Sequence, residues 1–198
     1  MKKRKSQAEI VASLTDEELV RQLYYSQFIF IFIAFISSLF LFPSLQKWLE
    51  LFSMNGKDIV LYGLVPGVLI VFMNVLSIRI LPAEYFDDGG INERIFRNRN
   101  IQEIFLIALV VSLSEEILFR GVIHTVFGFV VGSVAFALAH IRYLRKPVLI
   151  GSVLVVSFLL GYTYELTGNL AVTMTTHFTI DFLLALYIRF KRGDEVDV

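Results

Sequence analysis

Two adjacent carboxylates and an arginine stand in a stretch that is otherwise almost pure hydrocarbon. The segment SLSEEILFRG places Glu115, Glu116 and Arg120 between the apolar runs IFLIALVV and VIHTVFGFVVGSVAFALA. Glu116 and Arg120 are four residues apart with the acid first, which is the favoured order for an ion pair on a helix. Glu115 points about 100° away around the same helix and has no partner on it. The spacing predicts one neutralised pair and one carboxylate that is free to act as a base.

The three histidines of the chain also lie in apolar surroundings. His177 and Asp181 are four residues apart in HFTID, where an Asp can fix the tautomer of an imidazole or share a metal with it. His140 ends the segment FALAH, and His124 is expected to make a hydrogen-bonded contact between helices. Two carboxylates and two histidines that converge from three helices suit hydrolysis by an activated water. A carboxylate would take the proton, and the histidines would stabilise the oxyanion or hold a divalent metal.

The surroundings of these residues indicate an integral membrane protein. Of the 198 residues 56% are hydrophobic, with a mean hydropathy of +0.69, whereas a soluble domain is usually about 45–50% apolar. Backbone groups in lipid must be paired within each span, which favours an all-α bundle. An ionisable side chain at the centre of a span costs about 3 kcal/mol or more, so these residues should face one another or a water-filled cavity. We predict six transmembrane helices, at about 24–43, 58–81, 101–120, 121–141, 147–166 and 169–190.

The basic residues predict how the bundle is oriented. In a six-span arrangement, 15 of the 18 Lys and Arg residues fall on one side, in the N-terminal tail, the second connection, the 142–147 loop and the C-terminal tail. The opposite side holds only Lys47 and Lys57, and Arg120 is inside. An excess of Lys and Arg marks the cytoplasmic side, so both termini are predicted to be cytoplasmic.

Four segments follow from this organisation. Residues 1–23 form a cytosolic amphipathic segment, in which Thr15-x-x-Glu18 has the pattern of a capping box that opens a short helix. Residues 24–100 hold two spans and a polar loop, 101–190 hold the other four spans with the candidate catalytic residues, and 191–198 form a cytosolic tail. Gly168 and Asn169 in ELTGNL mark a tight turn, and the break between the third and fourth spans falls near either Gly121 or Gly128.

Absent motifs exclude several mechanisms. The chain has no Cys, which removes disulfides, a thiolate metal site and a cysteine nucleophile. It has neither the HExxH of zinc peptidases nor the GxSxG of serine hydrolases. Asp181 is the only Asp deep in a span, so an aspartyl dyad cannot form. The formal net charge of zero gives no indication of a nucleic-acid partner.

Three short motifs, EEILFR, FALAH and HFTID, occur in the order and approximate spacing of the motifs of the CPBP family. The chain resembles this family over about residues 101–185. The family comprises CAAX-type prenyl-protein endopeptidases, bacteriocin-processing enzymes and prokaryotic relatives labelled abortive-infection proteins. The resemblance implies that Glu115 is the general base, that Glu116 and Arg120 are the supporting ion pair, and that His140 helps to activate the water.

The same resemblance gives His177 a role in stabilising the oxyanion or binding a metal, together with Asp181. The second position is Asn or Asp in the family, and the difference matters because Asn can donate a hydrogen bond whereas an ionised Asp only accepts. Asp181 is therefore expected to orient His177, or to complete a site of His140, His177 and Asp181 for one divalent metal such as zinc. A metal-free glutamate mechanism and a metalloprotease mechanism both stay open.

We predict a polytopic membrane endopeptidase of the prokaryotic cell membrane, with a peptide or protein substrate that reaches the lipid bilayer. The alternative is a non-catalytic membrane adaptor or immunity protein that keeps the polar cluster for packing or partner binding. A proton-coupled transporter is a third reading, although no inverted repeat is visible. One spacing conflicts with the main prediction: Glu115 lies about 21 Å along a span that enters near residue 101, whereas His140 lies near the cytoplasmic end of the fourth span.

Overall fold

The computed structural model describes residue 11 and residues 13–191, and all regular secondary structure in this part of the chain is helical. The predicted basic residues at positions 2–5 and most of the predicted tail, 192–198, lie outside the described residues. The elements of the first half are α2 (Asp16–Leu41), α3 (Lys47–Glu50), α4 (Gly56–Asp58), the π-helix η1 (Ile59–Leu64), α5 (Val65–Ile80), η2 (Ala83–Phe86) and α6 (Ile91–Phe96). Those of the second half are α7 (Ile101–Glu116), the π-helix η3 (Ile117–His124), α8 (Thr125–Phe127), α9 (Phe129–Ala139), η4 (Ile141–Tyr143), α10 (Pro147–Thr167) and α11 (Leu170–Phe190).

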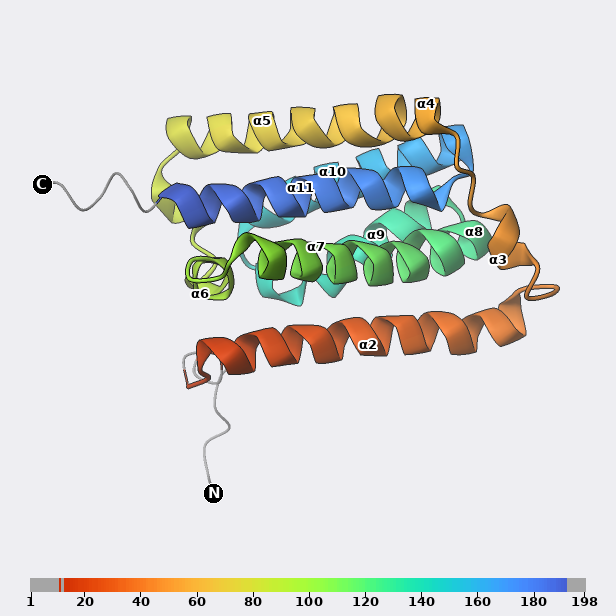
Figure 1. The fold of residues 1–198 in the computed structure, drawn as a ribbon, viewed down its shortest axis with the longest axis horizontal. Coiled ribbons are helices and arrows are strands. Elements are labelled where there is room, and N and C mark those ends of the chain that lie inside the picture. Colours follow the sequence, from red (N-terminus) through yellow and green to blue (C-terminus); the bar gives the residue numbers. More distant parts are fainter. Residues whose placement is uncertain (1–10, 12, 192–198) are drawn as a thin grey trace, which may run out of the picture.

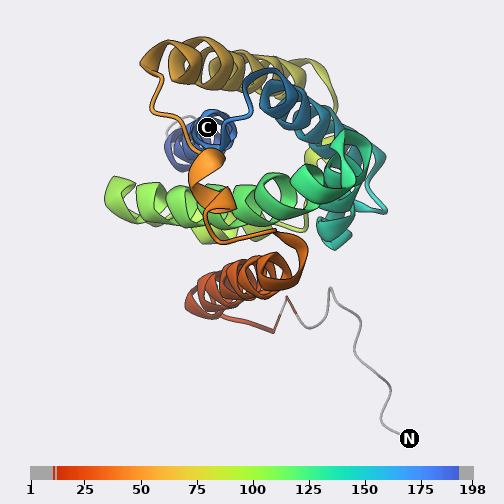
Figure 2. The same cartoon turned by 90° about the vertical axis from the view of Figure 1, so that its right-hand side faces the viewer.

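The long helices lie side by side as one bundle (Figures 1 and 2). The helix α11 lies between α5 and α7, and α2 packs on the other side of α7. The beginning of α2 and the end of α11 lie at the same end of the bundle, and α3 and α4, which carry Lys47 and Lys57, lie at the opposite end (Figure 1). This arrangement agrees with the predicted placement of the two termini on one side.

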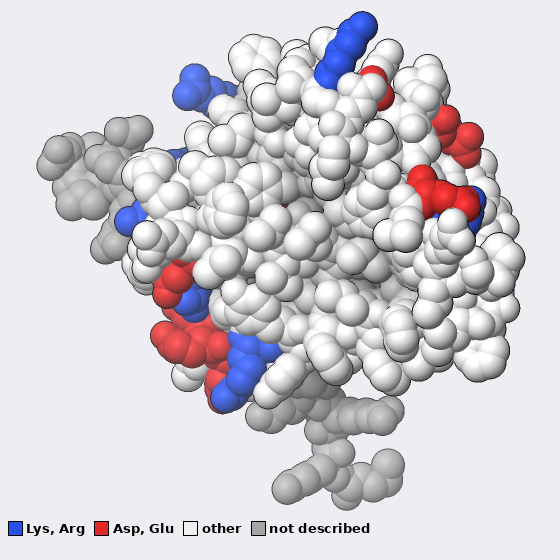
Figure 3. Space-filling model, turned by 45° about the vertical axis from the view of Figure 1, so that its right-hand side comes forward, with Lys and Arg blue, Asp and Glu red and all other residues white. Residues whose placement is uncertain are grey.

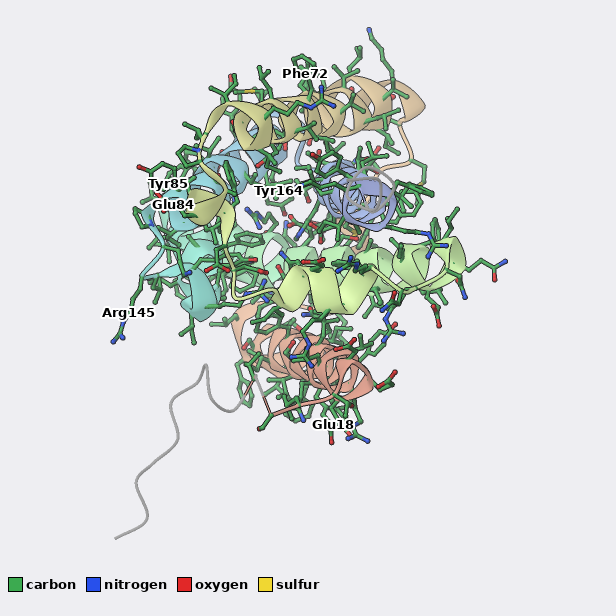
Figure 4. The ribbon with its side chains drawn as sticks, turned by 90° about the vertical axis from the view of Figure 1, so that its left-hand side faces the viewer. Glu18, Phe72, Glu84, Tyr85, Arg145 and Tyr164 are labelled. Atoms are coloured by element: carbon green, nitrogen blue, oxygen red, sulfur yellow. The ribbon has the colours of Figure 1, made fainter. Side chains whose placement is uncertain are left out.

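The outside of the bundle is apolar. Figure 3 shows a face that is largely free of charged side chains, with Lys, Arg, Asp and Glu gathered toward its edges. Phe72 stands on the outward side of α5 (Figure 4) and is 66% exposed. Such a surface would be a liability in water but is the expected one in a bilayer.

The predicted all-α membrane bundle is confirmed, whereas the count of six spans is not. Within residue 11 and residues 13–191, four helices are long and apolar enough to cross a membrane: Asp16–Leu41, Gly56–Ile80, Pro147–Thr167 and Leu170–Phe190. The helices α7, η3 and α8 follow one another without a break, with 16, 8 and 3 residues, so together they are long enough to cross a membrane. They are not among the four apolar helices because they contain the two glutamates and the arginine. The predicted span 121–141 is instead the end of that helix followed by α9. With 11 residues, α9 is too short to cross a bilayer.

The capping box predicted at Thr15 and Glu18 is present, with hydrogen bonds of 3.2 and 2.8 Å between each side chain and the other residue's backbone N–H. It opens the 26-residue α2, not a short separate helix, so the predicted boundary at residue 23 falls inside a continuous helix. The reason is that no Gly or Pro separates the amphipathic start from the apolar run that follows it. The first turns of α2 pack through Leu19 and Val20 against Ile95 of α6 and Ile107 of α7.

Gly128 is the position at which the third and fourth predicted spans separate. Its φ of +89° lies in the region that favours glycine, whereas Gly121 is helical within η3. The chain reverses at Gly128, and α9 runs back along η3. A Cβ at Gly132 would lie 2.7 Å from Cβ of His124, so only a glycine allows this close approach. Residues at equal distances before and after Gly128 therefore face each other.

Two glycines bring the second long helix against α11. A Cβ at Gly63 would lie 3.1 Å from the carbonyl oxygen of Val172, and a Cβ at Gly67 would lie 2.9 Å from Cβ of Thr179. Small residues four apart allow such close packing of helix backbones in a membrane. The helix α11 is held between α5 and α7 in this way, with His177 turned into the interior.

Candidate active site

The ion pair predicted from the spacing in EEILFR is present in the interior. Nη1 of Arg120 lies 3.1 Å from Oε1 of Glu116, and both side chains are 0% exposed. Nη2 of Arg120 donates to the backbone oxygen and to Oγ of Ser157 at 2.9 and 3.0 Å. The guanidinium lies over the ring of Phe136, 4.3 Å from its centre. The pair therefore anchors the α7–η3 helix to both α9 and α10.

His177 lies between two carboxylates. Its Nδ1 is 2.9 Å from Oε1 of Glu116, and its Nε2 is 3.4 Å from Oδ2 of Asp181. Because an ionised carboxylate only accepts hydrogen bonds, Nδ1 of His177 carries a proton toward Glu116. Oε1 of Glu116 thus binds both Arg120 and His177, and it connects α7 to α11. The sequence predicted its contact with the arginine but not that with the histidine.

Glu115 has a different environment from its neighbour Glu116. It is buried at 6% exposure, but it lines an interior cavity, which Glu116 does not. Oε1 of Glu115 accepts a hydrogen bond of 3.5 Å from Nε2 of Gln27, whereas Oε2 has no hydrogen-bond partner among the residues described. His140 and His177 are close enough to interact electrostatically with this carboxylate. Oε2 of Glu116 also has no hydrogen-bond partner among the described residues, so what sets Glu115 apart is that its side chain lines the cavity, where a proton acceptor can meet a water molecule.

His140 lies directly after the last residue of α9. Its Nδ1 is 2.9 Å from the backbone oxygen of Phe136, and a carbonyl oxygen only accepts, so Nδ1 carries a proton. In the neutral ring Nε2 then keeps its lone pair. The conflict in depth between this residue and Glu115 is resolved by the short α9. Glu115 is 13 residues before Gly128 and His140 is 12 after it, so the antiparallel hairpin brings them to similar heights.

A cavity of about 1010 Å³ joins these side chains. Glu115, His140, His177 and Asp181 all line it, and they come from α7, the end of α9 and α11. The lining continues along apolar side chains of α10 and α11 to the polar loops after α5 and α9. Four of the six predicted site residues therefore line one cavity, and Glu116 contacts both His177 and Arg120 next to it.

The polar segments that follow α5 and α9 are hydrogen-bonded to each other at the mouth of this cavity. Nζ of Lys146 donates to the backbone oxygen of Asp87 at 2.7 Å, and Nδ2 of Asn92 donates to the hydroxyl of Tyr143 at 3.2 Å. The hydrogen bond from the backbone N–H of Gly89 lowers the pKa of Asp87 below its ordinary value, and the Lys146 ammonium lowers it further by a smaller amount. Asp87 is therefore ionised at neutral pH and pairs with Lys146.

The side chains predicted to bind a metal do not fit one as they are arranged. In the part of the chain that the structure describes, no three His, Cys, Asp or Glu residues form a group that could hold a metal ion. Both ring nitrogens of His177 face carboxylates, so neither is directed at a position shared with His140 and Asp181. A zinc ion bound by His140, His177 and Asp181 stays a prediction.

Two contributors to the site were missed in the sequence, Gln27 and Ser157. Both are buried; Ser157 stands alone in the apolar run VLVVSFLL, and Gln27 follows Ser26 at the start of the apolar run in YYSQFIFIF. Polar side chains at membrane depth usually contact one another, which is the signal that could have found them. Neither residue lies near the motifs in sequence, so the spacing within the motifs carried no information about them.

The fold and the site define a polytopic helical membrane protein with a buried acid–imidazole cluster at an interior cavity. Residues 97–183 match the family model described as type II CAAX prenyl endopeptidase Rce1-like, a segment that contains all six predicted site residues. The chain is 40% identical over 174 residues to "Uncharacterized protein YpbD" of Bacillus subtilis (strain 168), covering 87% of this chain and 92% of that protein. No solved structure gives a significant match.

This chain belongs to the type II CAAX prenyl endopeptidase Rce1-like family. The resemblance seen in the three motifs is thereby confirmed. Membership supports a membrane-embedded protease of the CAAX type, and the bacterial relative supports a prokaryotic origin.

Proposed function

We propose that this protein is an intramembrane endopeptidase in which Glu115 activates a water molecule for hydrolysis of a peptide bond. The observation that carries the proposal is the shared cavity: the partner-free Oε2 of Glu115 belongs to a side chain that lines the same space as His140, His177 and Asp181. Family membership supports the reaction class. A substrate segment would enter past the polar loops at the mouth and lie along the apolar wall of α10 and α11.

The proton path follows from the free atoms of the site. Nε2 of neutral His140 accepts one hydrogen of the water and orients it, and Oε2 of Glu115 takes the other as the water oxygen attacks the carbonyl carbon. A new C–O bond forms and the carbonyl electron pair moves to its oxygen. When the C–N bond breaks, the proton held by Glu115 passes to the leaving nitrogen, which restores the carboxylate.

His177 stabilises the oxyanion in this scheme. Glu116 holds its Nδ1, which fixes the ring so that Nε2 points toward the cavity side, at Asp181. A substrate oxygen that reaches this N–H would receive a hydrogen bond from a ring that needs no reorientation, the condition under which such donors are most effective. Because Nδ1 also carries a proton, an N–H at Nε2 makes the ring an imidazolium, which the carboxylates of Glu116 and Asp181 on its two sides stabilise.

The proposed substrate is a peptide or protein whose scissile bond reaches the bilayer, and the family supports a CAAX-type C-terminus. The test uses purified protein in detergent and fluorogenic peptides that end in a CAAX sequence, with and without a prenyl group. Glu115→Gln should lower the hydrolysis rate about 10²- to 10⁴-fold, the usual contribution of a general base.

The matched control is Glu103→Gln, the same change on the same helix. Glu103 is exposed and caps the first turn of α7, where Gln preserves the capping box. This control should keep the wild-type rate. Full activity of Glu115→Gln in a folded protein contradicts the proposal.

The metal is tested separately, by measuring metal content per chain beside the hydrolysis rate before and after a chelator. About one zinc per chain, with a rate lost on chelation and restored by zinc, supports the predicted metal site and requires a rearrangement of His177. A rate that is unchanged by the chelator supports the metal-free glutamate mechanism.

A further inference from the structure

Gln27, on α2, contacts the side chain that the proposed mechanism uses as its base. The residue is 5% exposed, and its Nε2 lies 3.5 Å from Oε1 of Glu115. Two serines complete its environment: Oγ of Ser114 lies 2.6 Å from Oε1 of Gln27 and 2.6 Å from the backbone oxygen of Val110, which share its one hydrogen, and Nε2 of Gln27 donates to Oγ of Ser26 at 3.1 Å. Both donors and the acceptor of this amide are therefore in use inside the membrane.

The orientation of the amide follows from its neighbours. The hydroxyl of Ser26 donates its only hydrogen to the backbone oxygen of Leu23 at 2.7 Å, so its oxygen can only accept from Gln27. This places the NH₂ group on the side of Ser26 and Glu115. The reversed amide would bring its oxygen against the oxygens of both Ser26 and Glu115, which offer it no hydrogen when Glu115 is ionised.

We propose that Gln27 is a positioning residue for Glu115, an inference that rests on the proposed function. Its N–H holds Oε1 and thereby sets the plane of the carboxylate, which leaves Oε2 as the oxygen available to the water. The contact of 3.5 Å is long for a hydrogen bond, as catalytic contacts without substrate often are, and it shortens when Glu115 is charged.

This assignment gives α2 a part in catalysis. Gln27 lies well outside residues 97–183, the segment that matches the family model, so the matching core does not contain the whole site. The position of the base depends on α2 staying docked against α7, to which the apolar contacts of its first turns also contribute.

The experiment replaces Gln27 by Met, which has a similar size and shape but cannot donate to a carboxylate. Gln27→Met should lower kcat about tenfold with KM changed less than about twofold, because ground-state binding is not affected. The acid limb of the pH–rate profile should also move to higher pH, by about 0.5 to 1 unit, since a donor to the charged form of the base is lost. A loss of folded enzyme would scale this profile without moving it.

Ser38→Ala is the matched control for loosening α2. Ser38 is a buried polar residue on the same helix, and its Oγ accepts from Nε1 of Trp48 at 3.2 Å, far from Glu115. This control should lower stability and leave the pH–rate profile in place. If the wild type cleaves peptide, Glu115→Gln does not, and Gln27→Met keeps both the wild-type kcat and profile, the positioning role is wrong and the endopeptidase stands. If the wild type cleaves nothing, the proposed function itself fails.

Discussion

Two polar clusters lie among the apolar helices of this protein, and they are built differently. The site cluster joins Glu115, Glu116, Arg120, His140, His177 and Asp181 across three helices. The far cluster, near the Gly128 turn, consists of His124, Thr125, Tyr164 and Glu165. In it, Nε2 of His124 lies 2.8 Å from Oε1 of Glu165, and Oγ1 of Thr125 lies 2.7 Å from the Tyr164 hydroxyl. The sequence predicted this role of His124 as a contact between helices.

The clusters differ in where their carboxylates lie and what surrounds them. Glu165 has a side chain that is 54% exposed, whereas the side chain of Glu116 is 0% exposed and Glu115 is 6% exposed. Among the described residues, four members of the site cluster line the large cavity and no member of the far cluster does. A histidine and a glutamate at hydrogen-bond distance occur in both clusters, so this pairing does not by itself separate them. A carboxylate with a free oxygen at a cavity is the distinguishing feature.

The largest difference between the clusters should appear when the buried ion pair is broken. Arg120→Met leaves Glu116 buried without its main counter-charge and should lower the free energy of unfolding by about 3–5 kcal/mol. Unfolding in detergent by increasing denaturant measures this change.

The double variant Arg120→Met/Glu116→Gln serves as the test of this cause, because Gln keeps an acceptor for His177 but carries no charge. It should recover at least half of the loss. Arg145→Met is the surface control, since Arg145 is exposed and directed away from the bundle (Figure 4), and it should stay within about 0.5 kcal/mol of the wild type. A double variant no more stable than Arg120→Met would show that packing, and not charge, is what Arg120 supplies.

The hairpin at Gly128 connects the two clusters. The substitution Gly132→Ala tests the close packing of α9 against η3 within this hairpin. The new methyl group would meet Cβ of His124 at 2.7 Å and its Cα at 3.0 Å, so backbone must shift. Overpacking of this kind costs about 1–3 kcal/mol. Gly151→Ala, in the second turn of α10 with open space around the added methyl, should not lower stability. Equal effects of the two changes would mean that α9 does not pack on η3 as described.

A smaller effect, on the hydrolysis rate, is expected from removing the carboxylate of Asp181, which contacts Nε2 of His177. Asp181→Ala should lower kcat/KM by about tenfold, equivalent to about 1.4 kcal/mol of transition-state stabilisation, because Nε2 loses its acceptor. Asp181→Asn should lose less, since the amide oxygen still accepts from Nε2. Steady-state kinetics on one peptide compare the two. An equal loss for Asn and for Ala would mean that charge, as in metal binding, is the function of this carboxylate, because both changes remove it.

The sequence predicted the bundle and the members of the site better than their arrangement. Hydropathy located α10 and α11 within a residue or two, and Gly168 ends α10 as expected, because these signals are local. The choice between Gly121 and Gly128 was open, since both glycines stand in one apolar run. The position of the break is decided by the packing of Gly132 against His124 of η3, a contact between two helices that the local sequence does not encode.

The contacts around the two glutamates show the same limit. Spacing on one helix predicted the ion pair of Glu116 with Arg120. The hydrogen bond of Glu116 to His177 and that of Glu115 to Gln27 involve other helices, so the spacing could not predict them. The predicted conflict in depth for His140 arose from treating 121–141 as a full span. With α9 only 11 residues long, the half-buried His140 lines the same cavity as Glu115.

The smallest effect is expected from the same carboxylate-to-amide change made in each cluster. Glu165→Gln should alter the free energy of unfolding by less than about 1 kcal/mol, because a pair with one exposed partner contributes little and the amide still bonds His124. Its hydrolysis rate should match the wild type. Glu116→Gln, which weakens the hold on both Arg120 and His177, should lower the rate on the same substrate. If Glu165→Gln reduces turnover tenfold, the far cluster acts on catalysis through the Gly128 hairpin, and the difference in burial and cavity access between the clusters does not decide their roles.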